Sequence, residues 1–234
     1  MKIAVITGAT KGIGRAIAEK FASEGFGVAF CSRNKGEGDK LAKYLSDTYK
    51  VDVLAMLCDV ANKKQLQAFA DAIKNRFNKV DVLVNNAGIF LPGQISSEDD
   101  KNFETQMEVN LNAPYYFTRM LLPLITQQQH SHIFNMCSTA SIMPYPNGGS
   151  YCISKYALYG MTKVLREEMK EKAVKVTAVL PGATFTASWD GVELPEERFI
   201  PAKDIAEAVW SAYNTSPSTV VEDVLIRPQL GDIV

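Results

Sequence analysis

The chain has 234 residues, of which 47% are hydrophobic and 22% charged, and its formal net charge is −1. This composition is typical of a globular protein with one large or two small domains, and the near-neutral charge argues against binding to nucleic acid or to an anionic membrane surface. With no apolar run near the roughly 18 residues that span a bilayer and no recognisable signal peptide, we expect a cytoplasmic protein that does not enter a membrane.

Seven short runs rich in β-branched residues predict seven strands. They are residues 2–7, 27–32, 51–58, 80–85, 132–138, 174–181 and 221–228. Their near-continuous apolar character is typical of strands covered on both faces, and helical patterns such as 13–24, 63–77 and 151–172 separate them. The repeated β–α–β order predicts an α/β doubly wound (Rossmann) fold, with a parallel seven-stranded sheet and helices on both faces. We see no linker or repeat, so we expect a single domain over residues 1–234.

The first predicted strand ends in "TGATKGIG", Thr7 to Gly14, immediately before a helix. Glycines in such a turn let backbone N–H groups approach a pyrophosphate, and the helix N-terminus attracts its negative charge. This position in the chain favours a dinucleotide-binding turn. The alternative is a tight turn without a ligand.

The second strand bears on which dinucleotide is bound. An acidic residue about 20 residues beyond the glycine turn would hold the ribose 2′-hydroxyl of NAD, but this chain has Arg33 in "CSRNKG". Lys11, inside the glycine turn, could approach the same place. Two cations and no carboxylate favour the 2′-phosphate of NADP(H). The alternative is that both side chains point into solvent.

The cysteines and histidines do not predict a metal site. The four cysteines are far apart in apolar runs, without a C-x-x-C pair, so we expect a reducing compartment and no disulfide framework. The two histidines, in "QQQHSHIF", have no acidic neighbour and are better interpreted as the polar entry to a strand.

The stretch "GGSYCISKYALYG" begins two Tyr-x-x-x-Lys pairs, Tyr151 with Lys155 and Tyr159 with Lys163. On a helix this spacing puts a phenol and an ammonium group on one face. By itself the spacing is weak evidence for catalysis, because tyrosines that pack inward beside solvated lysines give the same pattern.

Taken together, the motifs resemble those of the short-chain dehydrogenase/reductase family, over nearly the whole chain. The matching residues are Thr7, Gly8, Gly12 and Gly14, then Asn85-Asn86-Ala87-Gly88, Asn110, Ser138, Tyr151, Lys155 and Pro181-Gly182. Ser138 precedes Tyr151 by the family spacing of thirteen residues, whereas Tyr159 has no serine partner. The resemblance therefore selects Tyr151 and Lys155 as the catalytic pair and leaves Tyr159 as packing or subunit-contact surface.

The resemblance implies a site without a metal. Its catalytic residues would be Asn110, Ser138, Tyr151 and Lys155. Its cofactor-binding residues would be Gly8, Thr10, Lys11, Gly12, Ile13, Gly14, Ser32, Arg33, Asp59, Val60, Asn86, Ala87, Gly88, Tyr151, Lys155, Pro181, Gly182, Thr184 and Thr186. The cofactor would be NADP(H) in preference to NAD(H).

The implied reaction is hydride transfer between the cofactor and a carbonyl or alcohol, with Tyr151 as proton donor. A free phenol titrates near pH 10, and a pKa near 7 would require stabilising the phenolate by roughly 4 kcal/mol. The Lys155 ammonium group and an oxidised nicotinamide would favour the anion. Ser138 would bind the substrate oxygen, with Ser141 as a competitor for that role, and Asn110 would hold a water for proton relay.

The segment 183–201 is short for a substrate lid. Trp189, Leu194 and Phe199 could close over an apolar substrate or could only pin the loop to the domain, and Met143, Tyr145 and Pro146 form another candidate pocket wall. The ending "RPQLGD" is similar to that of sepiapterin-reductase-like and short hydroxy-acid-dehydrogenase-like branches. In a sepiapterin-type enzyme, Asp190 or Asp232 could bind the guanidine-like edge of a pterin.

Two alternatives remain for the whole protein: a non-redox NADP(H)-binding regulator or scaffold, and an isomerase or dehydratase on the same fold. The complete Ser138, Tyr151 and Lys155 set argues against the first. The resemblance also implies a homodimer or homotetramer, assembled through the helices around Asn110 and Tyr151.

Overall fold

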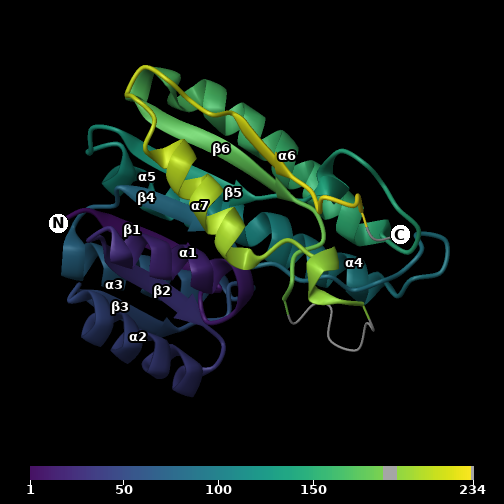
Figure 1. Ribbon diagram of the computed structural model, residues 1–234, viewed down its shortest axis with the longest axis horizontal. Coiled ribbons are helices and arrows are strands. Elements are labelled where there is room, and N and C mark those ends of the chain that lie inside the picture. Colours follow the sequence, from purple (N-terminus) through teal and green to yellow (C-terminus); the bar gives the residue numbers. More distant parts are fainter. Residues whose placement is uncertain (187–193, 233–234) are drawn as a thin grey trace.

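The computed structural model describes residues 1–186 and 194–232, and it confirms the doubly wound fold (Figure 1). Within these residues, seven parallel strands form one sheet in the order β3-β2-β1-β4-β5-β6-β7. The strands are β1 (Ile3–Thr7), β2 (Gly27–Ser32), β3 (Val53–Leu57), β4 (Val82–Asn85), β5 (Ser131–Met136), β6 (Val174–Pro181) and β7 (Asp223–Ile226). The strand order reverses between β1 and β4, where such sheets form a crevice beyond their carboxyl ends.

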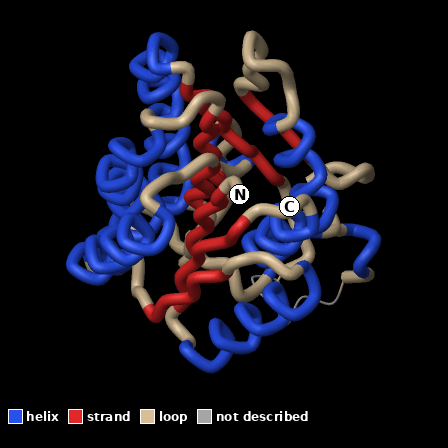
Figure 2. Tube along the Cα trace, turned by 90° about the vertical axis from the view of Figure 1, so that its left-hand side faces the viewer, coloured by secondary structure: helices blue, strands red, loops and turns tan. Residues whose placement is uncertain are grey.

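Helices cover both faces of the sheet, as Figure 2 shows with the strands between two helical layers. The α-helices are α1 (Gly12–Ser23), α2 (Lys35–Tyr49), α3 (Lys63–Phe77), α4 (Asp100–Met107), α5 (Ala113–Ile125), α6 (Gly149–Met169) and α7 (Ala202–Tyr213). The described residues also form four short turns of other helix types, η1 (Glu108–Asn112), η2 (Thr139–Ser141), η3 (Lys170–Lys172) and η5 (Glu196–Arg198). Among the described residues, none of these helices has the length and apolarity needed to cross a membrane.

The two edge strands are shorter than their sequence patterns predicted. The run 51–58 forms a strand only over Val53–Leu57, where it pairs with β2. The run 221–228 pairs with β6 only over Asp223–Ile226. An edge strand has a neighbour on one side, so its length is set by that single ladder rather than by its own apolar residues.

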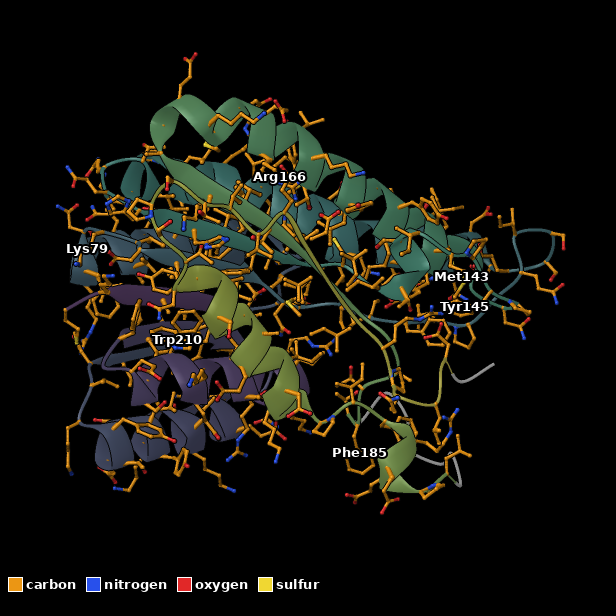
Figure 3. All side chains as sticks on the ribbon, turned by 45° about the horizontal axis from the view of Figure 1, so that its top comes forward. Lys79, Met143, Tyr145, Arg166, Phe185 and Trp210 are labelled. Carbon is orange, nitrogen blue, oxygen red and sulfur yellow. The ribbon has the colours of Figure 1, made fainter. Side chains whose placement is uncertain are left out.

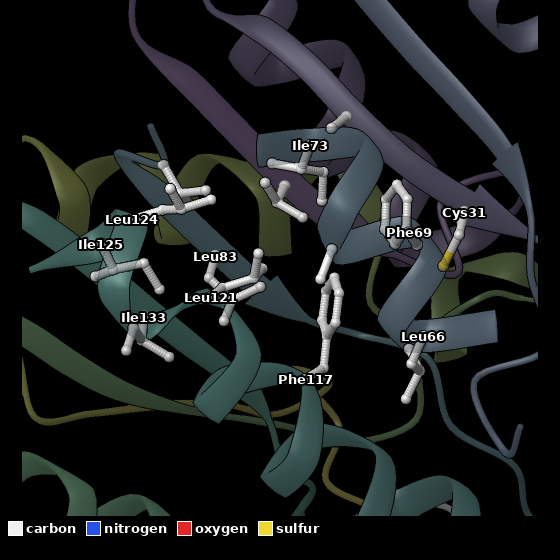
Figure 4. Close-up of a cluster of buried hydrophobic side chains, with 14 of the residues drawn as sticks. Cys31, Leu66, Phe69, Ile73, Leu83, Phe117, Leu121, Leu124, Ile125 and Ile133 are labelled. Atoms are coloured by element: carbon white, nitrogen blue, oxygen red, sulfur yellow. The ribbon is translucent and has the colours of Figure 1, made fainter. Parts of the chain in front are cut away.

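One hydrophobic core lies between the sheet and the layer of α3, α5 and α6, and its centre is shown in Figure 4. Phe69 of α3 stacks on Phe117 of α5, with ring centroids 5.4 Å apart. From β1, Ile3 and Val5 point into this core, while Ala4 and Ile6 point into the core on the opposite face. Both faces of the strand are therefore buried, which explains its continuous apolar run.

The second core lies under α1, α2 and α7. Its rim is aromatic: the rings of Phe21, Phe26, Trp210 and Tyr213 meet edge to face or tilted, with centroids 5.1 to 5.9 Å apart. Trp210 is labelled on α7 in Figure 3. Together the two cores fix both helical layers on the sheet, so the loops at the carboxyl ends of the strands rest on a rigid base.

Candidate active site

The turn between β1 and α1 requires glycine at several positions. Gly8 and Gly12 have φ angles of 66° and 53°, in the left-handed region that favours glycine. A Cβ atom on Gly14 would lie 2.4 Å from the carbonyl oxygen of Gly8 and 2.3 Å from Nδ2 of Asn86. The first turn of α1 contains no acidic residue, so its N–H groups and positive dipole favour an anion here.

A cleft of about 530 Å³ lies beside this turn. Most of the residues assigned to the cofactor line it: Gly8, Thr10, Lys11, Gly12, Ile13, Gly14, Ser32, Arg33, Asp59, Val60, Asn86, Ala87, Gly88 and Thr186. It is also lined by residues that sequence reasoning missed: Cys31, Asn34, Glu37, Cys58, Ile89 and Val109. Five assigned residues are not among those that line it: Tyr151, Lys155, Pro181, Gly182 and Thr184. The volume is in the usual range for a small-molecule site, and the glycine cradle and the two cations fit a dinucleotide phosphate.

The end of β2 supplies one polar rim of this cleft. Ser32 Oγ donates to the carbonyl oxygen of Asn34 at 2.8 Å, and the Asn34 side chain caps α2 by accepting from the backbone N–H of Glu37 at 3.1 Å. Arg33 is exposed. Lys11 Nζ lies 3.1 Å from a carboxylate oxygen of Glu37. Both predicted cations therefore stand at the cleft, but Lys11 is paired with an acid that the sequence pattern did not reveal.

The Asn85–Gly88 segment forms the opposite wall. The buried side chain of Asn85 donates from Nδ2 to Oδ1 of Asn135 on β5 at 2.8 Å. The hydroxyl oxygen of Thr7 accepts from the next two backbone amides of the segment, each at 3.0 Å. These bonds join the ends of β1, β4 and β5 and hold the wall in place.

Asn110 lies in η1, a single π-helical turn between α4 and α5. Its Oδ1 accepts from the backbone N–H of Ile89 at 2.9 Å. Its Nδ2 donates to the carbonyl of Ile89 at 2.9 Å and to Oγ of Ser154 at 3.0 Å. Such turns recur at functional sites because they redirect a side chain. Both amide protons are used, so a relay water would meet this side chain at the second lone pair of Oδ1.

Lys155 is buried, and its ammonium group contacts the protein rather than solvent. Nζ donates to the carbonyl oxygen of Met136 at 2.8 Å. A Cβ atom on Gly88 would lie 3.4 Å from Nζ, so the lysine reaches the wall of the cleft. Burial lowers the pKa of Lys155 to about 8, because desolvation disfavours the charged form.

Tyr151 lies on the same helix, with its ring centroid 5.7 Å from Lys155 Nζ. Burial raises the pKa of Tyr151 to about 12, and a hydrogen bond with Ser138 acts in the opposite direction. From the family resemblance we expected nearby positive charges to favour the phenolate. Burial is the larger of the two effects, so the phenol of Tyr151 keeps its proton at neutral pH.

The geometry separates Ser138 from its competitor Ser141. Ser138 precedes η2, its Oγ accepts from the backbone N–H of Ala140 at 3.1 Å, and it bonds to Tyr151. Ser141 is fully buried, and its Oγ accepts from the backbone N–H of Ser138 at 3.2 Å. Ser141 therefore fixes the turn, and Ser138 is the serine in contact with the phenol.

Aromatic side chains surround the phenol. The Phe90 ring lies edge to face with Tyr151, at a centroid distance of 5.0 Å, and 6.3 Å from the ring of Tyr145. Met143 and Tyr145, exposed at 42% and 39%, lie together near the N-terminal end of α6 (Figure 3). Pro146 is exposed as well, but none of the three residues of the predicted pocket wall is among those that line the cleft.

The predicted lid divides into parts with different roles. Phe199 is buried, which favours pinning of the segment to the domain, and its ring packs on Phe185 of the same segment at a centroid distance of 5.7 Å. Phe185 is exposed, and Figure 3 shows it on the segment after β6. Leu194 is also exposed. Trp189 and Asp190 lie outside the described residues.

Two other predicted groups are engaged elsewhere. Tyr159, of the second Tyr-x-x-x-Lys pair, donates to a carboxylate oxygen of Asp223 on β7 at 2.5 Å. Asp232 forms an ion pair with Arg227 through Oδ2, while its Oδ1 is buried and has no partner among the described residues. A Cβ atom on Gly182 would lie 3.1 Å from this oxygen. Within the described part of the chain, no cluster of three or more histidine, cysteine or acidic side chains could hold a metal ion.

Comparison with known proteins gives consistent matches over almost the whole chain. The model for short chain dehydrogenases matches residues 2–196. An uncharacterized oxidoreductase of Staphylococcus epidermidis is 32% identical over 228 residues, 97% of each chain. Sepiapterin reductase of Chlorobaculum tepidum is 33% identical over 246 aligned positions, which cover 99% of this chain and 98% of that protein.

Two solved structures have the same fold. An alcohol dehydrogenase from Thermococcus sibiricus, complexed with 5-hydroxy-NADP, superposes with a TM-score of 0.93 at 28% identity and covers 100% of this chain and 99% of its own. L-sorbose reductase from Gluconobacter frateurii, complexed with NADPH and L-sorbose, has a TM-score of 0.90 at 25% identity, with 97% and 95% covered.

Proposed function

Because the chain belongs to the short-chain dehydrogenase family, we propose that it is an NADP(H)-dependent oxidoreductase that reduces a carbonyl to an alcohol, or catalyses the reverse. The observation that carries this proposal is the set Ser138, Tyr151 and Lys155, held together beside a glycine-lined cleft. The two solved relatives, complexed with 5-hydroxy-NADP and with NADPH, support the choice of cofactor, as do Lys11 and Arg33.

Each residue of the site would have a different role in the reaction. When bound, NADPH would supply the hydride. Tyr151, protonated at neutral pH because its pKa is about 12, would give its proton to the substrate oxygen. Ser138 would donate a hydrogen bond to the same oxygen and stabilise its developing negative charge. The ammonium group of Lys155 would favour the phenolate left behind.

The first test is NADPH oxidation against a panel of carbonyls that includes sepiapterin, diketones, aromatic aldehydes and malonic semialdehyde. Tyr151→Phe removes only the phenolic hydroxyl and should lose about 100-fold or more in turnover while still binding NADPH. NADPH binding without turnover of any carbonyl would favour the non-redox regulator. Conversion of a substrate without net NADPH consumption would favour the isomerase or dehydratase.

For the substrate, a specific observation favours a pterin of the sepiapterin type. The buried Oδ1 of Asp232 has no partner among the described residues and lies beside the turn at Gly182. A buried carboxylate oxygen favours a donor, and the amino-pyrimidine edge of a pterin offers two parallel N–H groups. Asp232→Asn should therefore lower kcat/KM for sepiapterin by about tenfold or more and leave a simple diketone unaffected. Equal losses on both substrates would remove this assignment.

We propose assembly as a homodimer or homotetramer through α4, α5 and α6. These helices carry large, exposed apolar side chains in Tyr115, Tyr156 and Val164, and such surfaces commonly mark interfaces. Light scattering of the purified protein measures the state directly, and Val164→Glu should dissociate an assembly that uses α6.

A further inference from the structure

The ion pair between Lys11 and Glu37 lies where the proposed cofactor would place its 2′-phosphate. Both residues line the cleft, together with Arg33 and Ser32 at the end of β2. Lys11 is 66% and Glu37 38% exposed at the side chain, with 3.1 Å between Nζ and the carboxylate oxygen. The pair is reachable by solvent, so it can open when a stronger anion arrives.

The local fold explains why Glu37 faces the glycine turn. The Asn34 side chain caps α2 by accepting a hydrogen bond from the backbone N–H of Glu37. Glu37 is therefore fixed in the first helical turn. An acid here also suits the helix dipole. The substitution Glu37→Gln keeps the backbone cap and changes only the charge at the tip of the side chain.

The charges around the cleft balance. Among its lining residues, the ionisable cations are Lys11 and Arg33, and the acids are Glu37 and Asp59. Asp59 is engaged in its own turn, where Oδ1 accepts from the backbone N–H of Ala61 at 3.0 Å. Glu37 is therefore the acid that neutralises Lys11, one of the two cations predicted to bind the phosphate.

We propose that Glu37 is a specificity-determining residue, which competes with the 2′-phosphate of NADP(H) for Lys11 and so limits the preference for NADP(H) over NAD(H). This inference rests on the proposed function. A dianionic phosphate must displace the carboxylate from the ammonium group and then sit near its negative charge, whereas a ribose 2′-hydroxyl can instead donate to the carboxylate. Only the ligand that carries a 2′-phosphate is repelled by the negative charge of Glu37.

The test uses ligand binding without turnover. Dissociation constants of adenosine 2′,5′-bisphosphate and of ADP, which lacks the 2′-phosphate, are measured by calorimetry on the full chain. Glu37→Gln should tighten the bisphosphate about fivefold at low ionic strength, with no gain for ADP, and the gain should shrink in high salt. NADPH and NADH, followed by fluorescence, should show the same difference.

Asp47→Asn is the matched control. It removes one negative charge from the same helix, but Asp47 pairs with Lys43 at 2.8 Å and is not a lining residue of the cleft. It should change neither ligand's affinity. In a Lys11→Met background, Glu37→Gln should lose most of its effect, because the cation for which the carboxylate and the phosphate compete is gone.

The outcomes separate this inference from the cofactor assignment. Wild-type affinities for NADPH and NADH test the assignment. The change caused by Glu37→Gln tests the inference. Four results would each overturn the role of Glu37, even if the wild type prefers NADPH. Two concern Glu37→Gln by itself: no gain in affinity for the bisphosphate, or an equal gain for ADP. The other two are an equal gain from Asp47→Asn and an undiminished gain from Glu37→Gln in the Lys11→Met background.

Discussion

Asn86 donates two hydrogen bonds to Thr7 across the switch in strand order. The backbone N–H of Asn86 donates to Oγ1 of Thr7 at 3.0 Å, and Nδ2 of Asn86 donates to the carbonyl oxygen of Thr7 at 2.9 Å. The same Nδ2 reaches the carbonyl of Gly8 at 3.0 Å. Thr7 ends β1 and Asn86 follows β4, so the pair ties the glycine turn to the opposite wall of the cleft.

Thr7→Val should weaken this wall without changing side-chain shape. The variant removes the acceptor for the backbone amides of Asn86 and Ala87, and a partly buried donor without a partner costs about 1–3 kcal/mol. We expect a comparable loss in the free energy of unfolding, measured in urea, and weaker NADPH binding. Thr7→Ser keeps the hydroxyl and should recover most of both, whereas equal losses in the two variants would point to packing alone.

Asn110 and Asn112 offer a matched pair on the π turn. Asn110→Ala leaves the backbone N–H and carbonyl of Ile89 without their amide partner and should cost about 1–3 kcal/mol of stability, together with most of the turnover. Among the described residues, the side chain of Asn112 donates to a carboxylate oxygen of Glu108, four residues away on the same turn, at 2.7 Å. Asn112→Ala should therefore change stability by about 0.5 kcal/mol or less. Thermal unfolding and NADPH oxidation measure both effects, and similar losses in the two variants would contradict this role for Asn110.

Much of the site could be predicted because the carboxyl ends of parallel strands meet at one edge of the sheet. Gly8, Ser32, Asp59 and Asn86 each lie at or just beyond the carboxyl end of a different strand, yet they line one cleft. Local patterns also identified the strands, since burial on both faces leaves a continuous apolar run. The assignment of Ser138 and Tyr151 to one catalytic set came from the family resemblance rather than from local chemistry.

The remaining features depend on contacts between distant segments. The strand order has no local signature, because an apolar run does not specify its neighbours. The π turn at Asn110 looks like ordinary helix in sequence and is set by its bonds to Ile89 and Ser154. The pairing of Lys11 with Glu37 joins two helix starts and has no periodic pattern. Edge-strand lengths were overestimated for the same reason.

Lys155 predicts a specific dependence of stability on pH. Its pKa is about 8 in the folded protein against an ordinary lysine value of 10.5, so between those values the unfolded chain binds more protons. The contribution of this lysine to stability therefore rises with pH over this window, by about 3 kcal/mol in total. The advantage of Lys155→Met over wild type, measured by urea unfolding, should shrink by that amount from pH 7 to pH 10.5. A difference independent of pH would contradict the burial of the ammonium group.

The N-terminal end of α6, which carries Tyr151, is fastened to the loop before α4. Ser150 Oγ donates to a carboxylate oxygen of Glu98, and the backbone N–H of Gly149 donates to the carbonyl of Gly93 at 3.1 Å. A Cβ atom on Gly149 would lie 2.8 Å from the carbonyl oxygen of Gly93 and 3.1 Å from a carboxylate oxygen of Glu98, so the two segments are in close contact. Because Ser150 directly precedes Tyr151, this contact holds in place the first turn of α6, from which the Tyr151 side chain extends.

Glu98→Ala should therefore lower kcat more than it changes cofactor affinity. Removing the acceptor frees the fully buried Ser150 hydroxyl and loosens the first turn of α6, and a small displacement of a catalytic group costs about tenfold or more in rate. The KM for NADPH should stay near the wild-type value, because Glu98 is not among the residues that line the cleft. Glu104→Ala, at an exposed acid on α4, is the control and should leave both constants unchanged. Ser150→Ala should reproduce the loss, and the double variant should be no worse than either single one; additive losses would show that the two residues act separately.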